Sequence, residues 1–337
     1  MFVPLKKIFF SKKSKDILKL KQNFISSNDA LIQQARSWNK FYNKQPKRKV
    51  CKNCENKLGK AAFSSHLANY TICSLCGHFN GLNKDTKKFN QYLYKDNEGK
   101  KFSKFYIKDY KSRVKNIYIA KLKFLKKIIK GKKEILEVGS GAGHFLKACE
   151  DSGIKAKGFD VNLSMVKLGK KMLKKNEIDH FGINDIYDYV LKCQKEILVI
   201  LGAIEHLENP NLIFKNFKKS EAKYMFISVP LISLSVFLEH SFQNFYPRVM
   251  GGVHNHLYSE QSLKYIIKKN KLNVIGEWWF GTDIMDLMRA VLVYAKPKDE
   301  IKYHKGFEKY FMSAIDDLQN VLDKKKICGD VHMIITK

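Results

Sequence analysis

The chain of 337 residues is 45% hydrophobic and 12% aromatic, which suits one large globular domain and a smaller module. Its formal net charge is +31, but only five of its 63 basic residues are arginines, and the lysines are spread along the whole chain. Because arginine binds phosphates bidentately and lysine does not, this charge fits a lysine-rich composition better than nucleic-acid binding. No apolar run reaches the ~18 residues of a membrane span, and the run Ile8–Phe10 is too short for a signal peptide.

Residues 1–50 are basic and carry a short apolar face formed by Ile17, Leu18, Leu20 and Phe24. We expect a helical extension that packs on the body of the protein or stays solvated. A membrane-surface role is the alternative, but it needs a longer apolar face. Residues 81–130 are predicted to form a tyrosine-rich connector followed by a helix over 111–130, which Gly131 ends.

Four of the seven cysteines form two pairs, Cys51-x2-Cys54 and Cys73-x2-Cys76. The spacing is typical of a zinc ribbon, and four thiolates suit a closed, tetrahedral and therefore structural Zn²⁺ site. Two redox pairs are the alternative, but no thioredoxin-like βαβ pattern surrounds either of them. We predict a zinc ribbon over 51–80, with His66 and His78 as bystanders. Cys149, Cys193 and Cys328 are predicted to be buried thiols, and the absence of an export signal predicts the reducing cytoplasm.

From residue 131 apolar runs of strand length alternate with helical patterns. Strands are expected at 133–138, up to Asp160, near 179–183 and at 197–201, 224–229, 272–280 and 330–336. This alternation predicts a doubly wound α/β domain over 131–337, built on a seven-stranded, mainly parallel sheet. Two insertions are expected, at 231–258 and at 283–327. The second begins with a helix over 283–296, although its apolar residues 290–296 are the rival for the last strand.

The most informative segment is Ile135-Leu-Glu-Val-Gly-Ser-Gly-Ala-Gly-His-Phe145, in which a buried strand holds Glu137 and a glycine-rich turn precedes a helix. Glycines at 139, 141 and 143 let the backbone turn sharply and approach a ligand closely. A dinucleotide fingerprint, G-x-G-x-x-G, needs glycine at position 144, where His144 stands. The pattern E-x-G-x-G-x-G instead resembles the first motif of class I S-adenosylmethionine (SAM)-dependent methyltransferases, which have a Rossmann-like fold.

Two further acids follow the next two strands. Asp160 ends Gly158-Phe159-Asp160, and its carboxylate can accept both hydroxyl protons of a ribose. The resemblance implies that Asp185 faces the adenine amino group and that Glu137 helps to hold the methionine end of SAM. It also implies that Gly139, Ser140, Gly141, Gly143 and Gly202 belong to the cofactor site. A helix cap or a solvated turn is the other interpretation of each acid, but three acids at one sheet edge favour SAM.

The fourth strand runs into Gly202-Ala-Ile-Glu-His-Leu-Glu-Asn-Pro210, which resembles the E-H-L-x-x-P turn of methyltransferases that act on small molecules. It differs from the Asp/Asn-Pro-Pro-aromatic turn of enzymes that methylate the amino groups of bases. In a quinone-modifying relative, two glutamates and the histidine of this turn hold a divalent cation. Here Gly202 replaces one glutamate, so no metal is expected at the turn, and His206 is either structural or catalytic.

The insertion 231–258 carries His254 and His256, and long insertions beside the carboxyl edge of a sheet commonly build substrate pockets. Either histidine can take a proton from an accepting hydroxyl or amine; a solvated loop histidine is the alternative. Ser259 can cap the next helix, but a full capping box needs Glu or Gln at position 262, where Ser262 stands. Trp278-Trp279-Phe280 is similar to methyltransferases of bacterial cell-surface glycan pathways, although adjacent tryptophans also suit a core.

The resemblance implies methyl transfer from SAM to a hydroxyl or amino group of a small molecule, with a sugar or nucleotide-activated sugar as the first choice. An RNA methyltransferase that uses the ribbon and the basic residues is one alternative, and the scattered lysines oppose it. A scaffold with a degenerate SAM domain is another, which the intact glycines and Asp160 oppose.

Overall fold

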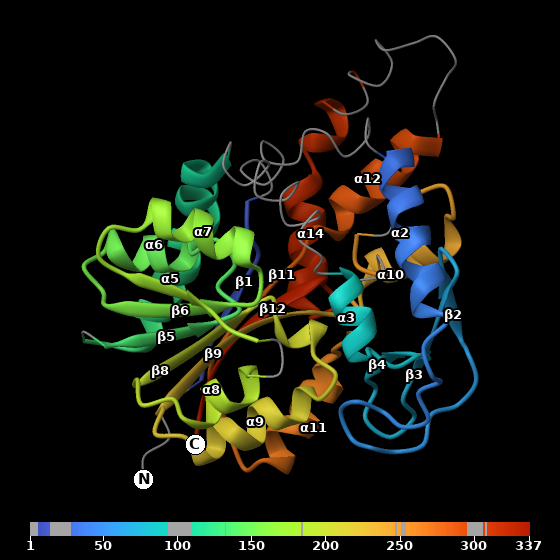
Figure 1. Ribbon diagram of the computed structural model, residues 1–337. Coiled ribbons are helices and arrows are strands. Elements are labelled where there is room, and N and C mark those ends of the chain that lie inside the picture. The colour runs from blue at the N-terminus through green and yellow to red at the C-terminus, as the bar shows by residue number, and fades with distance from the viewer. Residues whose placement is uncertain are drawn as a thin grey trace.

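The computed structural model describes residues 6–13, 28–93, 109–131, 133–182, 185–246, 248–250, 254–294, 306 and 309–337. Its centre is an eight-stranded sheet, in which β12 runs antiparallel to both neighbours and the other pairings are parallel (Figure 1). The strand order is β1 (Lys7–Phe10), β11 (Asn273–Phe280), β12 (Asp330–Thr336), β9 (Tyr224–Pro230), β8 (Ile197–Leu201), β5 (Ile135–Val138), β6 (Ala156–Asp160) and β7 (Glu177–His180). The predicted doubly wound, mainly parallel α/β fold is confirmed.

The predicted number of seven strands is wrong, because the amino-terminal residues supply an eighth. β1 lies parallel to β11, with Phe9 opposite Trp278. Phe9 also packs edge-on against Phe124, with 5.7 Å between the ring centroids. The strand covers an edge of the sheet that would otherwise expose unpaired backbone groups. Within 1–50, where a helical extension is expected, the described residues form β1 and the helix α2 (Asn28–Tyr42), and the apolar face predicted at 17–24 lies outside the described residues.

Helices cover both faces of the large sheet (Figure 1). One face carries the π-helical turn η1 (Val114–Tyr118), α5 (Ile119–Ile128), α6 (His144–Glu150) and α7 (Leu163–Met172), and the other carries α8 (Ile186–Leu191), α9 (Pro210–Lys219) and α11 (Glu260–Lys269). In β8, Ile197 and Val199 belong to the hydrophobic core under α5, α6 and α7, whereas Leu198 and Ile200 belong to the core under α8, α9 and α11. A strand buried on both faces must be apolar throughout, which explains the continuous run that identifies β8 in the sequence.

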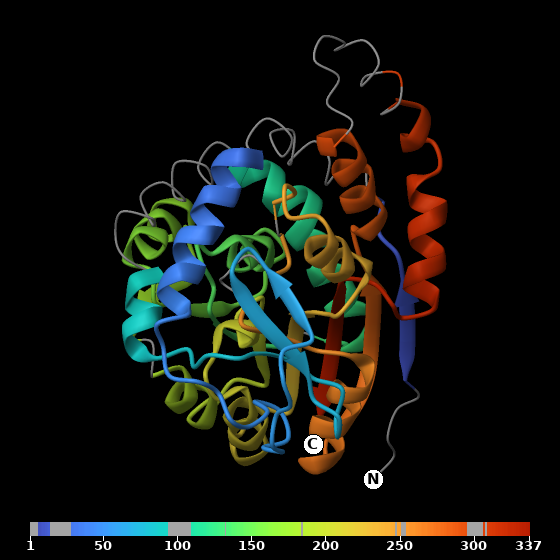
Figure 2. The same ribbon diagram turned by 90° about the vertical axis from the view of Figure 1, so that its right-hand side faces the viewer.

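The ribbon residues belong to a second sheet of four strands, in the order β10-β4-β3-β2. The ribbon supplies β2 (Phe63–Ser65), β3 (Ala68–Ile72) and β4 (Phe79–Gly81), and the short helix α3 (Lys87–Leu93) follows it. The fourth strand, β10 (His256–Leu257), comes from the insertion after β9. Figure 2 shows the ribbon strands beside α2 and α10 (Leu234–Ser241). Ribbon and large domain therefore share a sheet, and buried Tyr70, Phe79, Val236 and Leu257 join them in one core.

The carboxyl-terminal elements follow the predicted order. Residues 283–296 are predicted as a helix, and α12 (Asp283–Tyr294) occupies that place and packs against α14 (Ile315–Lys324). β12 closes the sheet as expected, so the rival strand at 290–296 is wrong. No helix among the described residues is long and apolar enough to cross a membrane.

The start of α11 differs from the prediction. Ser259 Oγ accepts a hydrogen bond from the Ser262 amide at 3.0 Å, and Ser262 Oγ accepts one from the Ser259 amide at 2.8 Å. The expectation that Ser262 prevents a full capping box is wrong, because a hydroxyl oxygen accepts a backbone hydrogen bond as a carboxylate does.

Candidate functional site

The glycine-rich turn after β5 lies at the carboxyl edge of the large sheet. Gly139, Gly141 and Gly143 all have positive φ, at 77°, 55° and 72°, which favours glycine at each position. A Cβ at Gly139 would lie 2.7 Å from Ala203 Cβ, so the turn contacts the loop after β8. A Cβ at Gly141 would meet no atom of the described residues within 4 Å. The backbone at Gly141 is therefore open to a ligand.

Two buried carboxyl groups come from the strands next to this turn, Glu137 from β5 and Asp160 from the end of β6. Glu137 is 2% exposed, and its Oε2 has no hydrogen-bond partner among the described residues. Asp160 accepts hydrogen bonds from the Gly141 amide at 2.7 Å and from the Asn162 amide at 2.8 Å, one on each carboxylate oxygen. Burial raises the pKa of Asp160 and, more strongly, that of Glu137. Each Asp160 oxygen keeps a second lone pair, so the carboxylate can still accept two hydroxyl protons.

The other predicted cofactor residues lie close by or further along the edge. Ser140 is buried, and its Oγ has no partner among the described residues. Gly202 directly follows β8 and has a φ of 72°. Asp185 is exposed and accepts a hydrogen bond from the Gly182 amide at 2.8 Å, which stabilises the turn before α8. Its partner in the motif, Asn184, lies outside the described residues.

The helical segment before β5 contributes side chains that the sequence did not reveal. The Tyr110 hydroxyl donates to the carbonyls of Ala142 and Gly143, at 3.1 and 3.2 Å, and its ring stacks on His144. Burial lowers the pKa of Lys121 to about 8, while the charges of Glu137 and Glu205 oppose this shift. A helical stripe does not show which lysine turns inward, so only the packing of α5 identifies Lys121.

The turn after β8 brings together three side chains that can ligate a metal. One ligand atom each from Glu205, His206 and His254 lies within 4.8 Å of the other two. Glu205 and His206 belong to the 3₁₀ turn η2 (Ile204–His206), and His254 comes from the insertion after β9. Two predicted catalytic histidines are therefore neighbours, with 5.0 Å between their ring centroids.

His256, the third predicted catalytic histidine, occupies a different environment. It is fully buried, and its Nε2 donates to the Ile204 carbonyl at 3.2 Å. Its Nδ1 lies 3.0 Å from His78 Nε2 and accepts from it. Both ring nitrogens are thus engaged within the protein, which suits a brace between the ribbon and η2. His78, predicted to be a bystander, is the other half of this brace.

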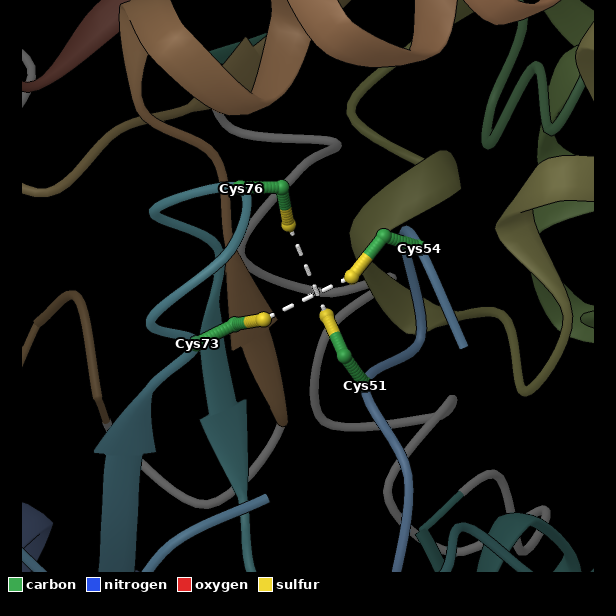
Figure 3. Close-up of side chains that lie close together, drawn as sticks. All are labelled: Cys51, Cys54, Cys73 and Cys76. Carbon is green, nitrogen blue, oxygen red and sulfur yellow. Dashed lines mark hydrogen bonds between the residues drawn. The ribbon is translucent and has the colours of Figure 1, made fainter. Parts of the chain in front are cut away.

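The four ribbon cysteines converge on one point (Figure 3). Cys51 Sγ lies 3.7 Å from Cys76 Sγ, and Cys54 Sγ lies 3.4 Å from Cys73 Sγ. Zinc–sulfur bonds of about 2.3 Å separate tetrahedral sulfurs by about 3.8 Å, so the cluster has the dimensions of a Zn²⁺ site. Asn53 and Asn80 each donate a side-chain hydrogen bond to one of these sulfurs, as thiolate ligands require. The remaining cysteines, Cys149, Cys193 and Cys328, are buried as expected.

The first cysteine loop also contacts the loop after β8 and helices α9 and α11 directly. Lys52 Nζ donates to the Leu207 carbonyl at 2.7 Å. Asn53 Nδ2 donates to the Ser262 carbonyl at 2.9 Å, and Asn53 in turn accepts from Asn211 through its own carbonyl. The ribbon therefore holds η2 and the start of α11 in place.

A known family matches the segment that contains these features. Residues 110–277, about half of the chain, match a family model described as a methyltransferase domain. The chain is a methyltransferase. The matched segment of this methyltransferase contains the glycine turn, Asp160, the turn after β8 and the insertion that carries His254.

Several solved structures are similar to this methyltransferase. A SAM dependent methyltransferase from Archaeoglobus fulgidus is 20% identical, with a TM-score of 0.42 over 65% of this chain and 92% of its own. Magnesium protoporphyrin IX methyltransferase from Synechocystis, with bound S-adenosylhomocysteine (SAH), is 8% identical, with a TM-score of 0.48 over 75% and 100%. The cyclopropane synthase MmaA2 from Mycobacterium tuberculosis is 12% identical, with a TM-score of 0.43 over 66% and 85%. No curated protein sequence matches the chain.

The tryptophan pair of this methyltransferase belongs to the core. Trp279 is 1% exposed and Phe280 7% exposed, and Trp278 donates from its indole nitrogen to the Ser11 carbonyl at 2.9 Å. These rings pack against neighbouring aromatic side chains, so the interpretation as core side chains is the better one.

Proposed function

We propose that this methyltransferase binds SAM across the tips of β5, β6 and β7 and transfers its methyl group to a hydroxyl or amino group of a small molecule. The observation that carries the proposal is the open backbone at Gly141, whose amide donates to the buried carboxylate of Asp160. Glu137 Oε2 and Ser140 Oγ are buried polar atoms without partners among the described residues, and a polar ligand would satisfy both. The residues present therefore fit a nucleoside with an amino-acid tail.

Each cofactor-binding residue then has a defined task. Asp160 accepts the two ribose hydroxyls, and Glu137 and Ser140 hold the methionine end. The glycine turn lets the backbone approach the cofactor, and Asp185 lies toward the adenine end of the edge. The sulfonium of SAM is already electrophilic, so the protein has to align the acceptor and remove its proton.

The acceptor faces the turn after β8, where His206 and His254 lie. We infer that His206 and His254 are better placed than His256 to act on the acceptor, because both nitrogens of His256 are engaged. A sugar or nucleotide-activated sugar of a cell-surface glycan pathway is the first acceptor to test, and the free cysteines suit a reducing cytoplasm. RNA is the less favoured acceptor, because the ribbon packs against η2 and α11 and is not a separate module that could bind RNA on its own.

SAH binding, measured by titration calorimetry, tests the cofactor site. The wild type should bind, and Asp160→Ala should weaken binding at least about ten-fold because two charge-assisted hydrogen bonds to the ribose are lost. Gly141→Arg should abolish binding, because the new side chain fills the opening. Gly59→Arg is the matched control, since a side chain there also meets open space but in the ribbon.

Unchanged SAH affinity in Gly141→Arg, with an unchanged melting temperature, would refute the cofactor site. The acceptor is tested by methyl transfer from labelled SAM to sugar nucleotides and RNA side by side. Label in the sugar fraction that disappears in Gly141→Arg supports the glycan proposal, and label in RNA alone refutes it.

A further inference from the structure

The cluster at the turn after β8 has the composition of a metal site. We propose that Glu205, His206 and His254 bind one divalent transition-metal ion beside the cofactor site. Their ligand atoms lie within 4.8 Å of one another, although 47 residues separate His206 from His254 in the chain. Ligand bonds of about 2.1 Å place adjacent donor atoms about 3.0–3.5 Å apart, so a small contraction of the three side chains completes the site.

Glu205 is the strongest indication that this cluster binds a cation. It is 4% exposed, yet its Oε2 has no hydrogen-bond partner among the described residues. A buried carboxylate without a partner is costly, and a bound cation removes that cost.

His254 is oriented as a metal-binding histidine is. Its Nδ1 donates to the Val249 carbonyl at 2.9 Å, which leaves the lone pair of Nε2 for a ligand. A hydrogen bond from the ring nitrogen opposite the ligand atom fixes the tautomer and the direction of the ring. The Val249 amide is itself held at 2.6 Å by Glu239, a buried residue of α10. Glu239 of α10 therefore holds the Val249 backbone, and Val249 in turn orients the ring of His254.

The donor set selects the kind of ion. Two imidazoles and one carboxylate suit zinc, iron, cobalt, nickel or manganese, whereas magnesium and calcium prefer oxygen ligands alone. Three protein ligands also leave open positions, as catalytic metal sites do. The sequence alone argued against a metal here because Gly202 lacks a carboxylate; the insertion supplies His254 instead.

The position of the site suggests its use, and this step rests on the proposed function. A Cβ at Gly202 would lie 3.5 Å from Glu205 Oε1, so the carboxylate lies against the tip of β8, beside the cofactor turn. An ion there would bind an acceptor hydroxyl and release its proton to water. The oxygen lone pair then forms the new bond to the methyl carbon, while the carbon–sulfur bond breaks and leaves its electron pair on sulfur, giving SAH. The inferred acceptor is thus an oxygen nucleophile.

Cobalt titration of the full chain with its ribbon already filled by zinc tests the site. One Co²⁺ per chain should bind, with the weak visible bands of nitrogen and oxygen ligands and without intense sulfur-to-cobalt charge transfer. His254→Ala and Glu205→Gln should each weaken binding at least about ten-fold. His240→Ala is the matched control, because this half-buried histidine contacts Ser64 of the ribbon and not the cluster; its affinity should equal that of the wild type.

The inference is overturned if no Co²⁺ binds beyond the ribbon, if the bands show thiolate ligation, or if both variants bind as the wild type does. Melting temperatures identify a variant that fails to fold, and His206→Gln then provides the second test. SAH binding on the same samples separates the two proposals. A wild-type protein that binds SAH but no Co²⁺ beyond the ribbon contradicts the metal site alone. A wild-type protein that binds Co²⁺ at this site but no SAH contradicts the proposed function.

Discussion

Lys52 and Asp85 form an ion pair in which both side chains are fully buried. Arg48 lies 3.6 Å from Asp85 and 2.9 Å from Glu208, so two cations and two anions balance one another beneath the turn after β8. Burial lowers the pKa of Lys52 and raises that of Asp85, and their mutual attraction opposes both shifts. Removal of either member would therefore leave the charge of the other buried with too little compensation.

Lys52→Met should therefore destabilise the protein by about 3–5 kcal/mol, because Arg48 alone then faces the carboxylates of Asp85 and Glu208 and a net buried negative charge remains. The free energy of unfolding from urea denaturation measures this loss. Lys195→Met is the control, since Lys195 pairs with Glu134 at the surface and such pairs contribute little. Equal unfolding free energies in Lys52→Met and the wild type would contradict the role given to the pair.

Single residues were predictable where the chemistry is local. Short sequence motifs identify the four cysteines, the three glycines and Asp160. The structure places the cysteine sulfurs together and the glycines at the sheet edge. The juxtapositions of Glu205 with His254 and of His78 with His256 were not predictable, because each joins segments far apart in the chain. No spacing rule connects such pairs; only the path of the insertion does.

At the level of elements, α10 and the loop after it depend on one buried acid. Glu239 is fully buried and accepts hydrogen bonds from the Val249 and Met250 amides, both at 2.6 Å. Burial raises the pKa of Glu239 to about 7, against an ordinary value near 4.5. Between these values the folded protein keeps a proton that the unfolded chain has lost.

Stability should consequently fall as pH rises from about 4.5 to 7, by about 3 kcal/mol in total from this group. Glu239→Gln cannot ionise and should lack this part of the slope. Urea unfolding of both proteins at several pH values measures the difference, and Glu221→Gln, an exposed position, should follow the wild type. Parallel curves for Glu239→Gln and the wild type would show that Glu239 is not the group responsible.

Elements were predictable where they are long and periodic. Except for α10 and β10, the strands and helices from residue 135 onward agree with the predictions to within a few residues, because each is either an apolar run or an amphipathic stripe. β1 and β10 were missed, and both are short strands that exist only through pairing with distant partners. A strand of two to four residues leaves no measurable alternation in the sequence.

For the whole molecule, the ribbon acts as a clamp on the turn after β8. Disruption of the four-cysteine site, by a metal chelator or by Cys76→Ser, should loosen this turn as well as the ribbon, because the bonds from Lys52 to Leu207 and from His256 to Ile204 depend on the ribbon's position. Hydrogen exchange read by mass spectrometry should rise over 51–81, 204–208 and 256–262. Exchange in β5 and β6 should not change, which provides the internal control. A rise confined to 51–81 would contradict the clamp.

The pairing of the earliest strand with one of the latest has a consequence for biosynthesis. Lys7–Phe10 meets its partner at Gly276–Trp279, and Phe79 and Asn80 meet theirs at His256 and Leu257. A ribosome adds roughly 5–20 residues per second, so the first strand waits on the order of 15–50 s before a place exists for it. During that interval the apolar run Ile8–Phe10 is unpaired and can associate with neighbouring nascent chains. Slower elongation would lengthen the exposure, and production in the cell should therefore depend on how early chaperones reach the emerging chain.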